Sequence, residues 1–164
     1  MKIRHFLLCL VVGLSLFVWG CVPSKSTTDY LVQGGYGEVS GRMGGVEFEA
    51  VVELAQKGER VRVEYLSPAS LCGITLTLEG ERCEVRVRDD MTFVCTPDEV
   101  AGLLRPATAF LTNGVAKSVQ KEGENTVLTF PDGSVLTLSP KGEPLSYSCG
   151  NFDARMTWWQ SGGK

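Results

Sequence analysis

Histidine is almost missing from this sequence: the only one among 164 residues is His5, in an apolar N-terminal segment. Once that segment is removed, no histidine remains to act as a general base, to activate a serine or cysteine nucleophile, or to bind a catalytic zinc ion. Serine–lysine pairs and paired carboxylates need no histidine, but no spaced motif in the sequence brings such residues together. We therefore expect no enzymatic activity, no catalytic residue, and no metal or other cofactor.

The sequence also lacks any C-x-x-C pair, although it contains six cysteines. Without that spacing, thioredoxin-like redox chemistry and zinc-ribbon ligation are both poorly supported. Two of the six lie in the first 21 residues. The others can form two disulfides in an exported domain or remain as buried thiols, and they are Cys72, Cys83, Cys95 and Cys149.

Basic residues are not in excess: 16 Lys and Arg stand against 19 Asp and Glu, for a net charge of −3. Loss of Lys2 and Arg4 with an N-terminal signal makes the remaining chain more acidic, at −5. An acidic surface is not typical of proteins that bind nucleic acid or anionic lipid. We therefore exclude nucleic acid as a partner and expect a tether, not a basic patch, to hold the protein to a membrane.

The first 21 residues contain a targeting segment. Lys2 and Arg4 precede an uncharged apolar run over residues 6–18. About 13 residues suit a secretory signal peptide, whereas a membrane span needs roughly 20. The junction Val18-Trp19-Gly20-Cys21 resembles the lipobox of bacterial lipoproteins, although Trp19 is larger than the residue usual at that position.

The lipobox resemblance implies a signal peptide over residues 1–20 and an acylated Cys21 as the new N-terminus, carrying diacylglycerol and a further chain such as palmitate. The alternative is that Cys21 merely ends an uncleaved anchor. Either way, we expect the rest of the chain to lie outside the cytoplasm, attached to a bacterial membrane. Residues 21–37 are polar, small and aperiodic, and we interpret them as a flexible tether before a single domain over 38–160.

Four segments between residues 45 and 88 alternate apolar and polar residues, as half-buried strands do. They are predicted at 46–54, 61–65, 72–78 and 83–87. The last two flank Gly80-Glu81, which fits a two-residue type II′ loop because glycine stands first. That loop places Leu78 opposite Cys83 and gathers the apolar side chains on one face.

A short strand is predicted at 91–95, after Asp89-Asp90. With a three-residue loop we expect Cys95 to face Val85 and to lie diagonal to Cys83. A bridge between Cys83 and Cys95 is then feasible, which leaves Cys72 to pair with Cys149.

Residues 96–99, Thr-Pro-Asp-Glu, predict the start of a helix, with Thr96 as N-cap, proline at the first position and Glu99 completing a capping box. Leu103 and Leu104 lie on its apolar face. We expect Pro106 to interrupt the helix and Asn113-Gly114 to end the segment.

Further strands are predicted at 115–121, 126–130, 135–138, 145–149 and 152–159, with a hairpin turn at Asp132-Gly133. Alternation in the last strand places Phe152, Ala154, Met156 and Trp158 on one face. Because adjacent strand residues point to opposite sides, either Trp158 or Trp159 should be exposed.

Strands joined by short turns form an antiparallel sheet, and a sheet of this length must curl. The predicted fold class is therefore mainly β (α+β): a curled antiparallel sheet or incomplete β-barrel, with one broken helix in its concave face.

Residues 48–54, 61–65, 66–76 and 136–144 resemble segments of the LolA/LolB family of bacterial lipoprotein carriers. The resemblance covers residues 38–159 and implies an incomplete β-barrel whose apolar cavity is covered by helices. The sequence departs from the family in having no long helix before Glu38 and no evident apolar loop for handing over cargo. No functional residue is therefore transferred from the family.

Two functions remain open. The first is binding of an apolar ligand, an acyl chain or a lipidated protein, by concave-face residues that otherwise form an ordinary filled core: Phe48, Val52, Val63, Tyr65, Ile74, Leu76, Leu103, Leu104 and Phe110. The second is a tethered interaction or structural module that binds a protein of the cell envelope or spore through an exposed tryptophan.

Overall fold

The computed structural model describes residues 33–88, 91–111 and 115–162. A 3-10 turn, η2 (Gln56–Gly58), follows the second strand, and another, η3 (Pro97–Val100), leads into the helix α3 (Ala101–Thr108). The strands of the described residues are β1 (Gly35–Met43), β2 (Val46–Leu54), β3 (Arg60–Ser67), β4 (Ile74–Glu79), β5 (Arg82–Val87), β6 (Met91–Cys95), β7 (Ser118–Glu122), β8 (Asn125–Thr129), β9 (Val135–Leu138), β10 (Pro144–Cys149) and β11 (Phe152–Ser161).

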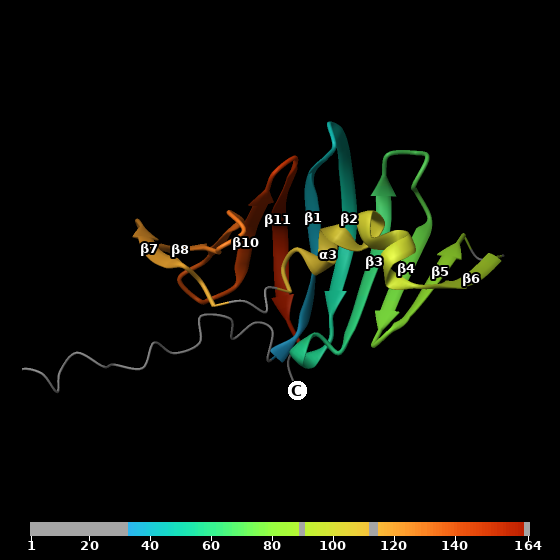
Figure 1. Cartoon of the computed structure of the whole chain (residues 1–164), viewed down its shortest axis with the longest axis horizontal. Coiled ribbons are helices and arrows are strands. Elements are labelled where there is room, and N and C mark those ends of the chain that lie inside the picture. The colour runs from blue at the N-terminus through green and yellow to red at the C-terminus, as the bar shows by residue number, and fades with distance from the viewer. Residues whose placement is uncertain (1–32, 89–90, 112–114, 163–164) are drawn as a thin grey trace, which may run out of the picture.

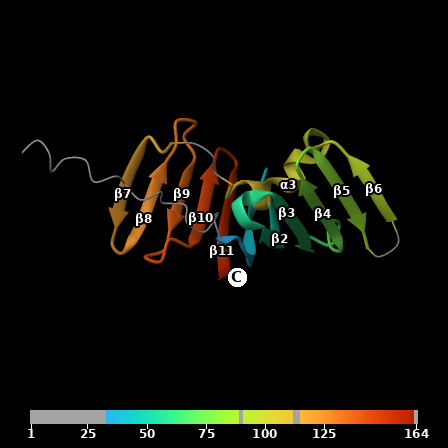
Figure 2. The ribbon, with the colours of Figure 1, turned by 90° about the horizontal axis from the view of Figure 1, so that it is seen from below.

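All of these strands belong to one antiparallel sheet, in the order β6-β5-β4-β3-β2-β1-β11-β10-β9-β8-β7. Strands β1 to β6 form one meander and β7 to β11 form a second. The two meet at the pairing of β1 with β11, in the middle of the sheet (Figures 1 and 2). The edge strands β6 and β7 do not pair with each other, so the sheet is not closed into a barrel. The predicted fold class, a large open antiparallel sheet with a short helix, is confirmed.

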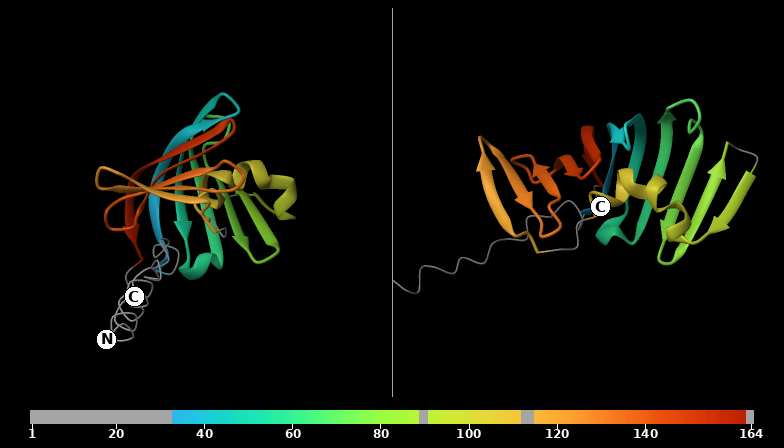
Figure 3. Two further views of the ribbon diagram at one scale, coloured as in Figure 1. Left: turned by 60° about the vertical axis from the view of Figure 1, so that its left-hand side comes forward. Right: turned by 45° about the horizontal axis from the view of Figure 1, so that its top comes forward.

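The helix lies on the crossover between the two edges of the sheet. After β6 the chain passes over the concave side as η3 and α3, and then reaches β7 at the opposite edge (Figure 3). The predicted start of this segment is confirmed: the Glu99 carboxylate accepts hydrogen bonds from the backbone N–H of Thr96 at 2.8 Å and from its hydroxyl at 3.0 Å.

The expected break at Pro106 is wrong, because α3 continues through it to Thr108. The irregularity lies earlier, at Val100 (φ −123°, ψ 14°), where the 3-10 turn gives way to the α-helix. A proline removes the hydrogen bond to the carbonyl four residues before it, here that of Gly102. Gly102 is exposed, so water can satisfy this carbonyl. The predicted end at Asn113-Gly114 lies outside the described residues.

The inward side chains of both meanders form the core. In β2 and β3 the predicted alternation is confirmed, since the inward residues from Phe48 to Leu54 and from Val61 to Tyr65 are at most 2 % exposed. Val46 also points to this side of the sheet but is 55 % exposed, because it is the first residue of its strand. The second meander contributes Leu128, Leu136, Leu138, Phe152 and Ala154.

The sequence pattern does not indicate β1, although this strand lies in the middle of the sheet. It begins at Gly35, so residues 35–37 belong to the sheet and not to the tether predicted over 21–37. Three of its inward positions are glycine, at 35, 37 and 41. Only Val39 and Met43 have the apolar side chains by which alternation is recognised in a sequence. Residues 33 and 34 lead into this strand, and the Gly34 carbonyl accepts a hydrogen bond from the Gly162 N–H at 3.0 Å. Residues 21–32 of the predicted tether, with Cys21, and the predicted signal peptide lie outside the described residues.

Glycine is required in β1 because β1 and β11 approach closely. A Cβ atom at Gly37 would meet the backbone oxygen of Trp158, and one at Gly41 would meet the backbone oxygen of Asp153. The backbone of Asp153 cannot move aside without disturbing the β1–β11 pairing, so these positions exclude any side chain.

A β-bulge in β11 reverses the expected positions of the tryptophans. Glu38 pairs with Trp158 and Val39 with Met156, so Thr157 is an extra residue on β11. A bulge shifts the alternation by one residue. Trp158 is therefore 42 % exposed on the outer face, and it does not share the inward face of Met156 as predicted. Trp159 packs against the core in its place.

The predicted hairpins are confirmed. Leu78 pairs with Cys83 across Gly80-Glu81, and Gly80 has a φ of +59°, as the first residue of a type II′ turn requires. At Asp132-Gly133 the glycine N–H donates to the Phe130 carbonyl at 3.0 Å. The Asp132 carboxylate accepts hydrogen bonds from the backbone N–H and the hydroxyl of Ser134.

Two glycine substitutions test the close approach at the centre of the sheet. Gly41→Ala should lower the free energy of unfolding by about 2–3 kcal/mol, because the new methyl group overlaps the β11 backbone. Gly102→Ala is the matched control: a Cβ there meets nothing within 4 Å, and the change should raise stability by roughly 0.5–1 kcal/mol. Urea unfolding followed by tryptophan fluorescence measures both. Equal stability of Gly41→Ala and the wild type would contradict the close approach.

Candidate ligand-binding face

The nine residues predicted to bind a ligand all lie on the concave side, in β2, β3, β4 and the helical segment. Two of them, Ile74 and Leu103, are half-buried. The other seven are at most 2 % exposed and form the packed centre of the core: Phe48, Val52, Val63, Tyr65, Leu76, Leu104 and Phe110. The structure therefore brings the predicted set together, with most of its side chains packed against one another.

Aromatic rings fill the centre of the concave side. Phe48 stacks on Phe152 with ring centroids 5.8 Å apart, and Tyr65 meets Phe48 edge-on at 6.4 Å. Tyr147 lies 6.2 Å from Phe152 and contacts Phe110 of the helical segment at 6.3 Å. This cluster joins both meanders to the segment that covers them.

The helix α3 is fastened to both meanders. The Tyr65 hydroxyl of β3 donates to the Leu103 carbonyl at 2.8 Å. At the other side, Arg105 donates to the Cys149 carbonyl at 3.3 Å and places its guanidinium 4.9 Å from the centre of the Phe152 ring. These contacts hold the helix over β2, β3 and the middle of the sheet.

Beyond the helix, the concave side of β4 to β6 is only partly covered. Seven of its inward residues are half-buried or exposed, including Leu78 and Cys95 beside Cys83. The five that lie in the cross-strand rows of Ile74 and Leu76 we call the open apolar face: Ile74, Val85, Val87, Met91 and Phe93. Met91 is 52 % exposed and Phe93 is 53 % exposed. Sequence reasoning found only Ile74 of these five. The alternation of 83–87 and 91–95 indicates their shared face, but not that the helix leaves it open.

The inward positions of β4, β5 and β6 share one chemical property. All nine are aliphatic, aromatic or sulfur-containing, and none carries a charge, amide or hydroxyl group: Ile74, Leu76, Leu78, Cys83, Val85, Val87, Met91, Phe93 and Cys95. A ligand on this face can therefore make apolar contacts, and the sulfur groups of Cys83, Met91 and Cys95 are the only parts of these nine side chains that can take part in a hydrogen bond, a weak one.

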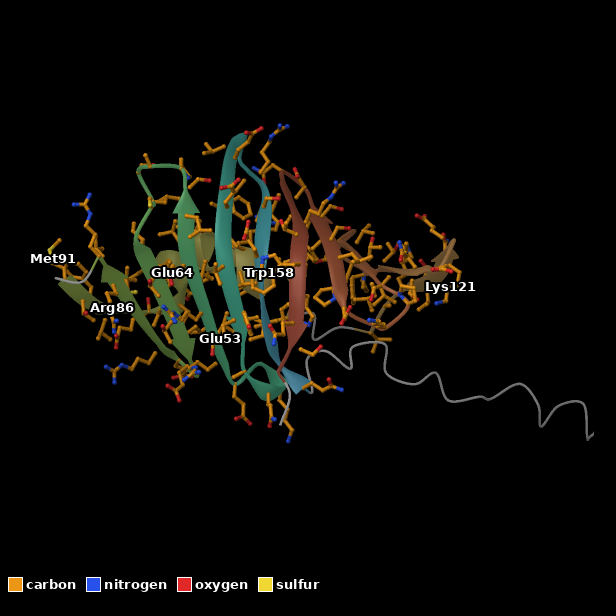
Figure 4. All side chains as sticks on the ribbon, turned by 180° about the vertical axis from the view of Figure 1, so that it is seen from behind. Glu53, Glu64, Arg86, Met91, Lys121 and Trp158 are labelled. Carbon is orange, nitrogen blue, oxygen red and sulfur yellow. The ribbon has the colours of Figure 1, made fainter. Side chains whose placement is uncertain are left out.

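The described pockets lie on the opposite, outer face of the sheet. One of about 460 Å³ lies at the base of β1 to β3, with Tyr36, Val51 and Arg62 among its lining residues. Two of about 260 and 320 Å³ are lined mainly by polar and charged side chains. Figure 4 shows this face, with Glu53, Glu64 and Arg86 on it.

Several charges on the outer face form ion pairs within the chain. Arg60 lies 3.0 Å from Glu53, and Arg62 lies 2.9 Å from Glu64. Ion pairs this exposed contribute about 0–1 kcal/mol each. The outward charges of β2 are all acidic, and arginines of the neighbouring strands pair with two of them, Glu47 and Glu53.

An aromatic pair lies at the centre of the outer face. The Tyr36 and Trp158 rings meet edge-on with centroids 5.4 Å apart, and both side chains are about two-fifths exposed, at 41 % and 42 %. The Trp158 indole N–H donates to Glu38 at 3.3 Å, and the Tyr36 hydroxyl donates to Gln160 at 2.6 Å. The prediction that one of the two adjacent tryptophans is exposed is confirmed.

The cysteines at the ends of β5 and β6 form a facing pair. Cys95 opposes Cys83 directly, and the expected pairing with Val85 is wrong. Three residues separate Val87 from Met91, as expected, but in an antiparallel pair this length places Cys95 opposite Cys83. Burial, together with the neighbouring Cys95 thiol, raises the pKa of Cys83 to about 11, so this thiol is protonated at neutral pH. Cys72, Cys83, Cys95 and Cys149 are all free thiols in the structure, so neither bridge considered from the sequence is formed.

A metal cluster and a membrane-spanning helix are both absent from the part of the chain that is described. No three His, Cys, Asp or Glu residues there are placed to hold a metal ion. No helix among these residues has the length and hydropathy to cross a membrane. Cys21, the predicted acylation site, lies outside them.

Replacing Tyr65 by Phe tests how the helix is held. Loss of the hydrogen bond to Leu103 should lower the free energy of unfolding by about 1 kcal/mol at pH 7. Burial raises the pKa of Tyr65 above its usual value of 10.0, so above that pH the folded state binds more protons than the unfolded state, and stability falls as pH rises. Tyr65→Phe should remove this part of the alkaline decline, measured by urea unfolding at several pH values. Tyr36→Phe, at an exposed site, should retain it. An unchanged decline in Tyr65→Phe would contradict the assignment.

Comparison of the sequence with protein families and with curated proteins finds no match. Among solved structures, the chain is similar to an uncharacterized conserved protein from Thermus thermophilus, with 14 % identity, a TM-score of 0.56, and 82 % of each chain covered. It is also matched to a LolA superfamily protein from Nitrosomonas europaea, with 13 % identity and a TM-score of 0.40, over 83 % of this chain and 75 % of the other. The first similarity shows a common fold alone, and at its lower TM-score the second carries no argument about this chain.

Proposed function

We propose that this chain is an extracytoplasmic protein, tethered to a bacterial membrane through an acylated Cys21, that binds an acyl chain on its open apolar face without catalysing a reaction. The tether is supported by residues 1–21, with their basic start, short apolar run and lipobox-like junction. The acyl chain can belong to a lipid or to a lipidated protein. In both cases the ligand presented to the sheet is a hydrocarbon.

The observation that carries the binding proposal is the exposure of Met91 and Phe93 beside half-buried Ile74, Val85 and Val87. A contiguous exposed apolar surface on a soluble domain is typical of a binding site. Because none of the nine inward side chains of β4 to β6 is polar, hydrocarbon is the ligand class that leaves no group without a partner. Methionine adds an adaptable contact for a flexible chain.

The packed centre of the core limits where such a ligand can lie. Phe48, Tyr65 and Leu104 are at most 2 % exposed, so an acyl chain cannot contact them while α3 stays in place. The ligand therefore lies along β4 to β6, beside Ile74 and Leu103, which are the two half-buried members of the predicted set.

A second candidate function is supported by the outer face. Exposed Tyr36 and Trp158, beside the 460 Å³ pocket, are the residue types enriched at protein interfaces. On this alternative, a protein of the cell envelope binds there and the open apolar face has no ligand. The two candidates use opposite faces of one sheet, so substitutions can separate them.

Mass spectrometry of the full chain, purified from its own membranes in mild detergent, tests the ligand. The native spectrum should retain a lipid-sized mass that the denatured spectrum loses. Met91→Glu should reduce the retained fraction about tenfold, because a charge on the concave side costs about 1.4 kcal/mol or more against hydrocarbon. Thr92→Glu, on the outer side of the same strand, and Trp158→Ala should retain it. Absence of any retained lipid, or equal loss in Met91→Glu and Thr92→Glu, would reject acyl binding on this face.

The denatured spectrum of the same sample tests the anchor. We expect the mass of residues 21–164 plus acyl groups, because acylation and cleavage at Cys21 remove residues 1–20. Cys21→Ser should abolish the acyl mass and leave the N-terminal segment attached. An unprocessed wild-type chain would show that the segment is an uncleaved anchor.

A further inference from the structure

The two edges of the sheet differ in character. Strand β6, Met91–Cys95, contains no charged residue, and Met91, Phe93 and Val94 are 52 %, 53 % and 63 % exposed. Strand β7 at the other edge carries Lys121 and Glu122, and Lys121 donates to Thr126 of β8 at 2.7 Å. Figure 4 shows Met91 and Lys121 at opposite ends of the sheet. Charged residues on an edge strand discourage pairing with another strand, so β7 is protected and β6 is not.

The sequence of β6 is complementary to itself when a second copy runs antiparallel to it. With Phe93 on the two-fold axis, Phe93 faces Phe93 of the other copy and Met91 faces Cys95 on the concave side. On the outer side, Thr92 faces Val94. Every pair is apolar or combines a hydroxyl with an apolar group, and no like charges are opposed. Aromatic pairs of this kind stabilise antiparallel strands.

Charges on the neighbouring strand β5 fit the same arrangement. Within one chain, Arg86 is beside Thr92 and Glu84 is beside Val94. In the dimer, Thr92 of one copy pairs with Val94 of the other, and the neighbour of that Val94 is Glu84. Arg86 of one copy therefore lies in the same cross-strand row as Glu84 of the other copy. The two-fold axis produces a second, identical row. The two charged residues are three strand spacings apart, roughly 14 Å between Cα atoms, so they place opposite charges across the interface without a direct contact. In the single chain Glu84 lies 3.8 Å from Arg86 and 3.8 Å from Arg82, and both are long contacts for ion pairs.

We propose that β6 is a homodimer interface, in which a second copy of this chain adds to the sheet by antiparallel β6–β6 pairing about Phe93. Such a contact is isologous and closes on itself, so the dimer leaves only the two charged β7 edges exposed. Pairing of β6 with β7 of another copy would instead build open chains. Strand addition supplies main-chain hydrogen bonds on the outer edge of β6, where no other described strand pairs with it. This proposal does not depend on whether the open apolar face binds a ligand.

Charge-swapped variants of Phe93 test the interface. Phe93→Lys places two like charges opposite each other on the two-fold axis, and Phe93→Glu does the same with the opposite sign. Each variant alone should show at least a tenfold smaller dimer fraction than the wild type, in native mass spectra of the full chain in detergent over a concentration series. An equimolar mixture of the two should recover a heterodimer, because lysine then faces glutamate. Circular dichroism should show that both variants keep the wild-type sheet.

The matched control is Val119→Lys in β7. Val119 is 58 % exposed, points to the same concave side and lies on the other edge strand, so it should leave the dimer fraction unchanged. A monomeric wild type at all concentrations would overturn the proposal. So would loss of the dimer in Val119→Lys, assemblies larger than a dimer, or two Phe93 variants that stay monomeric when mixed.

Discussion

The pairing of β1 with β11 is the constraint on which the rest of the structure depends. Each meander is built from neighbouring strands with short turns, but the two become one sheet only where Gly35 meets Ser161 and Met43 meets Phe152. The pairing joins residues more than a hundred positions apart in the chain, so it carries a large loop-closure entropy. Glycines in β1 let the two backbones approach closely. The aromatic cluster of Phe48, Phe152 and Tyr147 then forms across this line.

Features with local causes could be predicted from the sequence. The Gly80-Glu81 and Asp132-Gly133 hairpins and the helix start at Thr96 follow from a few adjacent residues, and all three are confirmed. Features set by a distant partner could not. β1 has glycine at three inward positions, so its pattern does not resemble a strand until β11 lies beside it. The bulge at Thr157, which turns Trp158 outward, likewise depends on pairing with Glu38 and Val39.

The residues of the candidate site also have some properties with local causes and others that depend on distant parts of the chain. Alternation identified the concave-side residues correctly as one surface, because the side to which a strand residue points is a local property. How deeply each is buried depends on where α3 comes to lie, and that is fixed by contacts such as Tyr65 with Leu103 and Arg105 with Cys149. Nothing in the local pattern therefore separates buried Phe48 from half-buried Ile74. The pattern also did not indicate that Met91 and Phe93 are exposed, because their exposure follows from the place of β6 at an edge of the sheet, beyond the helix.

The two proposals share strand β6 but use different groups of it. A ligand on the concave side contacts side chains, which stand perpendicular to the sheet, whereas a second copy pairs with backbone groups that lie in its plane. Binding at one therefore leaves the other accessible. If both occur, the open apolar faces of two copies become continuous through Phe93, and the apolar surface available to one acyl chain grows without any new pocket. Met91 then lies at the junction, beside Cys95 of the second copy, so ligand affinity should depend on dimerisation more strongly at Met91 than at Ile74.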